Sequence, residues 1–311
     1  MKLSSSVAWG LAALPAARAW GGFGHITVAY IASNFVSDPT AAYFQTLLRN
    51  DTSDYLANVA TWADSVRYTR WGRYTGVFHF IDAKDDPPHS CGVDLARDCK
   101  AEGCVVSAIH NYTSQLLPEA SGEGGGGGFA LPEWQRAQAA KFVIHFVGDI
   151  HQPLHDEDVA RGGNGIHALW GGVELNLHHI WDTRIPERAA GGVPRRKPFE
   201  AARRWADELT AEIRTGGFRA QSEAWLDGID LADPTATALA WAREGNAYVC
   251  STVLPEGPKA IVGQELGGDY YQKAAPVVEV QIARAGYRLA AWLDLIAANI
   301  TSGAVQSPDE L

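Results

Sequence analysis

The chain has 311 residues, of which 46% are hydrophobic, so it is long enough to bury a core as one large domain or two smaller ones. Its formal net charge of −10 at pH 7 argues against binding a polyanion through a basic surface, so a nucleic-acid enzyme of this composition would need bound cations. Beyond the first residues, no apolar run approaches the ~18–20 residues that a membrane span requires.

Residues 1–19 are typical of a secretory signal peptide. Lys2 precedes an apolar run over residues 7–17, and Ala17-Arg18-Ala19 is a small-x-small cleavage site. Loss of the two basic residues of this segment would change the net charge from −10 to about −12 and would give Trp20 a free α-amine. We therefore expect a secreted, extracellular protein that folds from Trp20 onward in an oxidising compartment.

Helical signals dominate the rest of the chain, because apolar residues recur at i, i+3 and i+4 whereas alternating runs are scarce. The predicted helices are 41–48, 56–68, 104–117, 133–151, 199–215, 234–254 and 270–300. Residues 169–177 could form a short β-hairpin around Gly171-Gly172. We predict a mainly α, single-domain multi-helix bundle over residues 20–300, followed by a C-terminal tail over residues 301–311.

Four cysteines in a chain with a secretory leader favour two disulfides, for which three pairings are possible. The close spacing of Cys99 and Cys104 is consistent with a small loop, which leaves Cys91 and Cys250 as a long clamp. A cysteine zinc site is the weaker interpretation, because the chain has no Cys-x-x-Cys pair. Three Asn-x-Thr sequons are candidate glycosylation sites, at Asn50, Asn111 and Asn299.

Histidines and aspartates recur at a spacing that suits metal ligands. His145 and Asp149 are one helical turn apart and project from the same face, and a following proline can end the helix and return His155 toward that face. His178 and Asp182 repeat the spacing. Each pair alone is more often an ordinary i,i+4 surface contact, but imidazole and carboxylate are also the ligand set of catalytic zinc sites.

Further candidates lie upstream. Asp64 and His79 each sit inside an apolar frame, where a buried carboxylate or imidazole needs a partner. His25 follows Trp20 by five residues, and the Trp20 α-amine becomes a nitrogen ligand once it is deprotonated. The ordinary alternatives are a core histidine bonded to a backbone carbonyl at His79, and a buried tryptophan on a flexible glycine arm at Trp20.

The order of these residues resembles that of the zinc-dependent single-strand-specific nucleases, which comprise secreted fungal enzymes and plant bifunctional nucleases. The likeness extends from Trp20 to about Ile296 and includes the contiguous motifs Trp-Ala-Asp, His-Phe-Ile-Asp, Gln-Pro-Leu-His and Trp-Asp-Thr. It implies a fold of the phospholipase C/nuclease type and endonucleolytic hydrolysis of phosphodiester bonds in single-stranded DNA and RNA. The expected products carry 5′-phosphates, and 3′-nucleotides are expected as further substrates.

The resemblance also implies three Zn²⁺ per chain. The first would be held by Asp64, His79, His145 and Asp149. The second would be held by the amine and carbonyl of Trp20 with His25 and Asp149, and the third by His155, His178 and Asp182. Three such cations would activate water and neutralise phosphate charge. They would therefore allow a chain with a net negative charge to bind a polyanion.

Substrate contacts follow from the same resemblance. Arg67 would stabilise the charge that develops on phosphorus, so it joins Asp149 as a candidate catalytic residue. Phe80 would stack on a base, while Asp82 and Asn164 would hydrogen-bond base edges. An ordinary helix-surface ion pair is the alternative for Arg67, and a core side chain for Phe80. Because stacking requires an unpaired base, these contacts imply a preference for single strands.

Two features depart from the family pattern. Arg161 stands where related fungal enzymes carry a small apolar residue, and it could stack through its guanidinium plane or contact a phosphate. The glycine-rich insertion over residues 122–128 could alter one rim of the cleft.

A zinc-dependent phospholipase C is the closest rival, since it shares the fold type and the N-terminal tryptophan ligand. Those lipases place the first histidine farther from the tryptophan and end in His-x3-Glu, whereas this chain has Asp182. A secreted zinc-binding protein without turnover would need the ligands but neither Arg67 nor Phe80. We predict no membrane association and no obligate protein partner.

Overall fold

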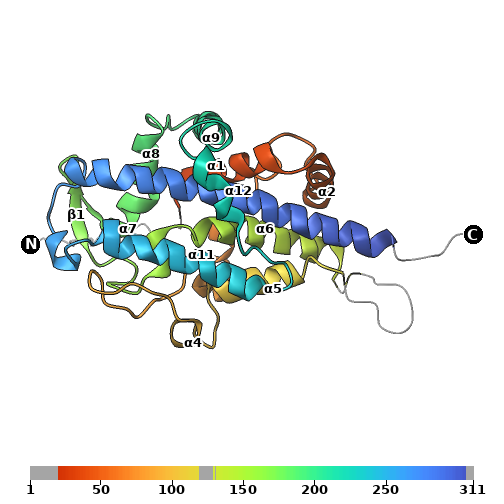
Figure 1. Cartoon of the computed structure of the whole chain (residues 1–311), viewed down its shortest axis with the longest axis horizontal. Coiled ribbons are helices and arrows are strands. Elements are labelled where there is room, and N and C mark those ends of the chain that lie inside the picture. The colour runs from red at the N-terminus through yellow and green to blue at the C-terminus, as the bar shows by residue number, and fades with distance from the viewer. Residues whose placement is uncertain (1–19, 119–128, 130, 306–311) are drawn as a thin grey trace, which may run out of the picture.

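The computed structural model describes residues 20–118, 129 and 131–305, and within them the chain is mainly helical, as predicted (Figure 1). The predicted signal peptide, the glycine-rich insertion and residues 306–311 lie outside the described residues. No helix in the described ranges is both long and apolar enough to cross a bilayer.

Seven helices in the described residues have ten or more residues each. They are α1 (Gly22–Phe35), α2 (Asp38–Leu48), α5 (Val105–Ser114), α6 (Glu133–Asp149), α9 (Pro198–Arg214), α11 (Pro234–Tyr248) and α12 (Asp269–Val305). Short α-helices are α3 (Trp62–Val66), α4 (Leu95–Asp98), α7 (Leu177–His179), α8 (Ile185–Ala189) and α10 (Arg219–Ser222). The 3₁₀ turns are η1 (Arg73–His79), η2 (Pro153–Asp156), η4 (Ala224–Leu226) and η6 (Pro258–Ala260), and the π-helical turns are η3 (Ile180–Arg184) and η5 (Val249–Val253).

Helix α12 runs along the long axis of the molecule and organises the core (Figure 1). It packs against α1, α2, α9 and α8, and also against α6. Helix α5 contacts both α6 and α11. The buried Trp292 of α12 donates a hydrogen bond to Thr113 Oγ1 at 3.0 Å and meets Trp241 of α11 edge to face at 5.8 Å between ring centroids. One continuous apolar core therefore holds the helices that carry the site.

Helix α1 was not predicted from the sequence. Every residue from Phe23 to Ala32 is buried, so the helix has no polar face and no amphipathic period to detect. Its glycines also argue against a helix on propensity alone. A Cβ on Gly24 would lie 2.9 Å from Cβ of the buried Trp20, so this close approach requires glycine. The segment that begins at Trp20 is thus a packed helix, and the flexible-arm alternative is wrong.

The predicted helix over residues 56–68 is wrong in its first half. Residues 53–61 form successive turns, with bonds such as Ala60 N to Ala57 O at 3.3 Å and Trp62 N to Val59 O at 3.0 Å, and only Trp62–Val66 is helical. Such turns repeat apolar residues about every third position, which resembles the helical period. The other predicted helices are present with shifted ends, and α12 continues through Val305 into the predicted tail.

The predicted β-hairpin is present. Strand β1 (His167–Trp170) pairs antiparallel with β2 (Val173–Asn176), with Leu169 opposite Glu174. Gly171 and Gly172 have φ values of 59° and 77°, and a two-residue turn of this kind favours glycine because both positions are left-handed. Asn176 at the end of β2 accepts a hydrogen bond from the backbone N–H of His179 at 2.7 Å, so the hairpin leads directly into α7.

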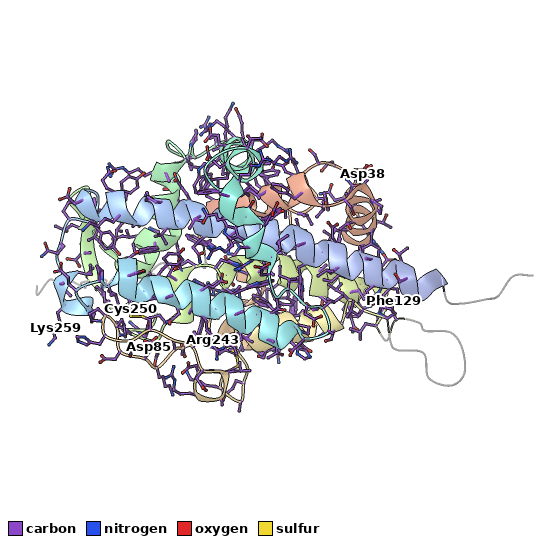
Figure 2. All side chains as sticks on the ribbon, in the orientation of Figure 1. Asp38, Asp85, Phe129, Arg243, Cys250 and Lys259 are labelled. Atoms are coloured by element: carbon purple, nitrogen blue, oxygen red, sulfur yellow. A yellow bond between two sulfur atoms is a disulfide. The ribbon has the colours of Figure 1, made fainter. Side chains whose placement is uncertain are left out.

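Both disulfides follow the favoured pairing. Cys91–Cys250 closes a sequence separation of 159 residues, and Cys99–Cys104 closes one of 5 residues. The long bridge ties the π-helical turn after α11 to the loop that carries Asp85 (Figure 2).

The two bridges should contribute unequally to stability. Replacing Cys91 and Cys250 by serine should lower the free energy of unfolding by up to ~5 kcal/mol, and replacing Cys99 and Cys104 by about 2 kcal/mol, because the entropy of closing a loop grows with its length. Urea unfolding of the two double variants checks this order. Equal losses would contradict it.

Candidate metal centre and substrate cleft

The predicted metal ligands come from eight separate pieces of the chain and converge in the core. Each of them is at most 5% exposed. In chain order they are Trp20 before α1, His25 on α1, Asp64 on α3, His79 at the end of η1, His145 and Asp149 on α6, His155 on η2, His178 on α7 and Asp182 on η3. Burying this many polar side chains together is costly unless they share partners.

Asp149 lies at the centre of the first group. Its Oδ2 is 2.9 Å from His79 Nδ1 and 3.3 Å from His145 Nε2. Asp64 Oδ1 is farther, at 3.9 Å from His145 Nε2. His79, His145 and Asp149 each offer a ligand atom, and these atoms lie within 4.8 Å of one another.

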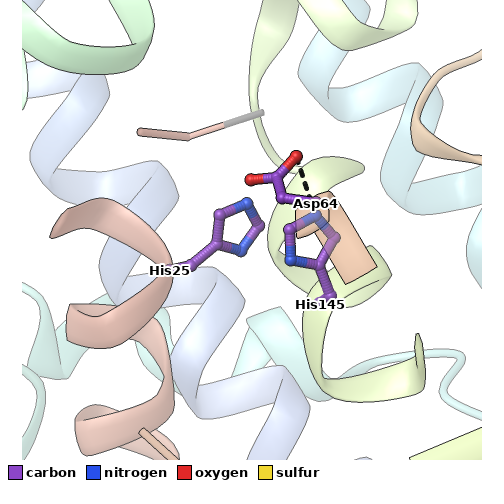
Figure 3. A group of neighbouring side chains, drawn as sticks. All are labelled: His25, Asp64 and His145. Atoms are coloured by element: carbon purple, nitrogen blue, oxygen red, sulfur yellow. Dashed lines mark ion pairs between the residues drawn. The ribbon is translucent and has the colours of Figure 1, made fainter. Parts of the chain in front are cut away.

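The other oxygen of Asp149 faces a different histidine. His25 Nε2 is 3.1 Å from Asp149 Oδ1, and the rings of His25 and His145 stack with centroids 3.8 Å apart. His25, Asp64 and His145 also offer three ligand atoms within 4.8 Å, with the Asp64 carboxylate at one end of the two stacked rings (Figure 3). The two oxygens of one carboxylate thus face two neighbouring ligand groups.

The third group contains His155, His178 and Asp182. His178 Nε2 is 3.1 Å from Asp182 Oδ2, and His155 Nε2 is 3.9 Å from Asp182 Oδ1. The structure therefore brings together all the predicted histidine and aspartate ligands in three adjoining sets. Trp20 is fully buried, and the N–H of the next residue, Gly21, donates to the carbonyl of Asp182 at 2.8 Å.

Backbone carbonyls orient three of the imidazoles. Nδ1 of His145 donates to Ala60 O, Nδ1 of His155 to His79 O, and Nδ1 of His178 to Gly162 O, each at 2.6 Å. Each of these bonds leaves Nε2 directed at the carboxylates, which is how protein metal sites commonly fix a histidine ligand.

Two residues that hold candidate ligands in place were not predicted from the sequence. Gln152 Nε2 donates to Asp182 Oδ1 at 2.6 Å. Gly162, whose carbonyl holds His178, has a φ of 58°, and a Cβ there would lie 2.5 Å from Leu154 O. Gln152 belongs to the Gln-Pro-Leu-His motif, so the signal was present without an assigned role.

At His25, His79 and Asp149, electrostatics favours the protonation states that a bound cation needs. Burial lowers the pKa of His79 to about 4 and also lowers the pKa of His25. Burial would raise the pKa of Asp149, but the charge of His145 and hydrogen bonds from the histidines hold it well below its usual range. At His145 burial is outweighed by the attraction of Asp149 and Asp64, which raises its pKa, so a metal ion would compete with a proton there.

The residues present fit bound zinc. Several buried polar atoms in these groups lack a hydrogen bond among the described residues, including His79 Nε2 and His155 Nε2. Buried polar atoms in native proteins are nearly always satisfied, so atoms of this kind that converge on one another indicate ion ligands. Imidazole nitrogens with carboxylate oxygens are the donor set that zinc prefers.

A cavity of about 410 Å³ opens over the metal groups. Its walls include all the residues that the sequence analysis assigned to the substrate: Arg67, Phe80, Asp82, Arg161 and Asn164. His79, His155 and His178 also line it, so the candidate ligands and the candidate substrate contacts share one cleft.

Arg67 and Phe80 both line this cleft. The Arg67 side chain is 11% exposed, and its Nη2 lies 3.1 Å from Asp64 Oδ1. Phe80 directly follows the candidate ligand His79 and is only partly buried, so its ring is not a core side chain. A cation thus lies beside the metal ligands, and an aromatic ring lies on the wall.

Lys100 is a cleft residue that the sequence did not reveal. Its Nζ lies 2.5 Å from Asp82 Oδ2, which raises the pKa of Lys100 through this hydrogen bond. The lysine stands in the short loop closed by the Cys99–Cys104 disulfide, and no spacing rule links that loop to Asp82.

The rim of the cleft is formed by a left-handed turn. Arg161 is exposed with a φ of 61°, and its carbonyl accepts a hydrogen bond from Asn164 Nδ2 at 2.8 Å. Arg161 therefore lies at the mouth of the cleft, and Asn164 is oriented by the backbone beside it.

Comparison with known proteins gives one consistent result. The S1/P1 Nuclease family model matches residues 20–298. Nuclease S1 of Aspergillus oryzae is 51% identical over 278 residues, which cover 89% of this chain and 92% of that protein. Nuclease P1 of Penicillium citrinum is 41% identical, over 89% of this chain and 97% of that protein. Endonuclease 3 of Arabidopsis thaliana is 31% identical, over 90% of each. The match begins at Trp20, the first of the candidate ligands.

Proposed function

Because the chain belongs to the S1/P1 nuclease family and is a phosphodiester-hydrolysing enzyme, we propose that it cleaves single-stranded DNA and RNA at a centre of three zinc ions. The observation that carries this proposal is the convergence of three buried His/Asp groups on one cleft that is also lined by Arg67 and Phe80. Membership of a nuclease family favours this activity over the phospholipase C alternative.

The proposed ligand sets are those that the family resemblance implied. Asp64, His79, His145 and Asp149 would hold one ion, Trp20 with His25 and Asp149 a second, and His155, His178 and Asp182 a third. Support comes from Asp149, whose two oxygens face His25 on one side and His79 with His145 on the other. Bound zinc would polarise the phosphate, activate water and stabilise the leaving oxygen.

The protein's own residues would position the strand. Arg67, which is fixed beside Asp64, would hold a non-bridging phosphate oxygen and stabilise the charge that grows on it during attack. Phe80 would stack on an unpaired base, and Asp82 and Asn164 would contact its edge. Arg161 at the rim would reach a phosphate or the outer face of the base.

The products follow from the bond that breaks. Water oxygen would attack phosphorus, the bond from phosphorus to the 3′ oxygen would break, and that oxygen would take up a proton. One product would then carry a 5′-phosphate and the other a 3′-hydroxyl. The same chemistry on a 3′-nucleotide would release inorganic phosphate, so 3′-nucleotides are proposed as additional substrates.

We also propose that the enzyme is secreted after cleavage behind Ala19, which would free the Trp20 amine, and that residues 20–300 act as one nuclease unit. Asn111 on α5 and Asn299 on α12 are exposed, and Asn50 is half-buried; all three stay candidates for glycosylation. Mass spectrometry of secreted protein before and after enzymatic deglycosylation tests the leader and the glycans together.

End-group analysis tests the reaction. A 5′-labelled single-stranded oligonucleotide cleaved by the zinc-loaded enzyme should give fragments with 3′-hydroxyl ends, and the downstream fragments should be substrates for a 5′-phosphatase. Release of inorganic phosphate from a 3′-nucleotide should accompany this activity. Fragments with 3′-phosphates would contradict the proposed bond cleavage.

Phe80→Ala should lower kcat/KM on single-stranded DNA by about 5- to 150-fold, because it removes a base stack worth ~1–3 kcal/mol. Phe80→Tyr should retain most activity. Phe199 of α9 offers a control, since this phenylalanine is 38% exposed and lies outside the cleft lining. If Phe80→Ala and Phe199→Ala cleave equally well, Phe80 does not hold the base.

A further inference from the structure

A segment beside the cleft alternates cations with aromatic rings. Residues 67–74 read Arg-Tyr-Thr-Arg-Trp-Gly-Arg-Tyr, and no acidic residue occurs between Asp64 and Asp82. In a chain with a net charge of −10, this stretch is a local reversal of sign. Of these residues, only Arg67 has a role in the proposed catalysis.

The later side chains of this segment point into solvent. Trp71 is 52% exposed and Tyr74 is 57% exposed, although large aromatic side chains are usually mostly buried. Arg70 and Arg73 are also exposed, and neither forms an ion pair with a carboxylate of the described residues. Four exposed side chains of this kind, grouped on the five residues 70–74, are unexplained by the packing of the fold.

The backbone beneath these side chains is held firmly. Thr69 Oγ1 donates to Val66 O at 2.7 Å and accepts from the Gly72 N–H at 3.0 Å, while Thr75 Oγ1 donates to Gly72 O at 2.8 Å. Gly72 is buried, and a Cβ there would clash with the Val66 backbone. A backbone that is already fixed lowers the entropic cost of binding, because the segment need not be ordered when a ligand binds.

The position of the segment links it to the cleft. It begins at Arg67, which lines the cleft, and it joins the candidate ligand Asp64 on α3 to the candidate ligand His79 at the end of η1. Trp71 lies 6.1 Å from Trp62, centroid to centroid, and Tyr74 lies 5.9 Å from Phe78. The exposed rings thus continue outward from the element that holds the metal ligands.

We propose that Arg70, Trp71, Arg73 and Tyr74 form an outer strand-binding surface for single-stranded polynucleotide beyond the catalytic cleft. The arginines would contact phosphates, and the two aromatic rings would stack on unpaired bases that flank the cleaved bond. Bases inside a duplex are stacked on their neighbours and offer no free face, so the surface favours the same single strands as the cleft. This inference rests on the proposed nuclease function and adds that long strands are bound better than dinucleotides.

Two double variants separate the surface from the catalytic centre. Arg70→Gln/Arg73→Gln removes two phosphate contacts, and Trp71→Ala/Tyr74→Ala removes two stacks. Matched controls are Arg195→Gln/Arg196→Gln, which removes two exposed arginines, and Trp134→Ala, which removes an exposed aromatic ring. The zinc-loaded proteins are assayed on an oligonucleotide of about 20 residues and on a dinucleotide.

For both surface variants we expect kcat/KM on the oligonucleotide to fall about tenfold, mainly through KM, while dinucleotide cleavage stays within about twofold of wild type. For the arginine variant, the slope of log kcat/KM against log salt should also become shallower by about 1.4. Neither control should change the ratio between the two substrates. Surface variants with an unchanged ratio and an unchanged salt slope would overturn the proposal.

Wild-type protein that cleaves neither substrate would contradict the proposed function and not this surface. Fluorescence anisotropy of the labelled oligonucleotide then tests strand binding directly. The proposed surface is supported if both surface variants bind the oligonucleotide about tenfold more weakly than their controls. It is overturned if all the proteins bind alike.

Discussion

Asp149→Asn is expected to lower kcat/KM on single-stranded DNA by at least about 10³-fold, the largest effect that we predict for one substitution. The carboxylate contacts His79 and His145 through one oxygen and His25 through the other, so the change unsettles two metal groups at once. An amide has the same shape but only one oxygen and no charge, and it cannot serve both groups.

Steady-state cleavage and metal analysis on the same preparation check this expectation, with fewer zinc ions per chain expected in the variant. Asp98→Asn is the matched control, because Asp98 is also buried and bonded but pairs with Arg97 and belongs to none of the ligand groups. The control should lose stability without losing zinc. Near-wild-type turnover by Asp149→Asn would contradict the bridging assignment.

Arg67→Ala is expected to lower kcat by about 10²- to 10³-fold with a smaller change in KM, because a cation beside the reacting phosphate acts mainly in the transition state. The guanidinium is largely buried next to Asp64, where its interactions are stronger than in open solvent. Arg67→Lys should recover part of the activity, since it restores the charge but not the planar fork.

Arg161→Ala provides the comparison for Arg67, since this arginine also lines the cleft but is exposed at its rim. Its loss should cost no more than about tenfold, because interactions of exposed charges are screened by water and salt. Zinc content must be measured in Arg67→Ala, as Arg67 contacts a candidate ligand. A purely KM-based loss in Arg67→Ala would assign it to substrate binding and contradict a transition-state role.

The candidate ligand residues could be picked out from the sequence because metal chemistry restricts both residue type and spacing. Two i,i+4 pairs are visible in the sequence: His145 with Asp149, and His178 with Asp182. Both pairs lie in the core of the folded protein. The hairpin was likewise predictable from Gly171-Gly172, because few other residues adopt two successive left-handed conformations.

Other features depend on contacts that no local pattern encodes. Helix α1 is buried on all sides, so it has none of the amphipathic period by which surface helices are found. Lys100 reaches Asp82 only because a disulfide loop and a strand-like segment meet in the fold. The alternation of arginine and aromatic residues after Arg67 is visible in the sequence, but their exposure and lack of carboxylate partners are properties of the folded chain.

The most direct test of the account compares denatured with duplex DNA as substrates for purified protein that begins at Trp20, with zinc counted on the same sample. The account predicts rapid cleavage of denatured DNA, slow cleavage of duplex, about three zinc ions per chain, and loss of activity with a chelator that returns on zinc addition. A chain that holds its zinc but cleaves neither substrate, or that cleaves denatured and duplex DNA equally well, would contradict it.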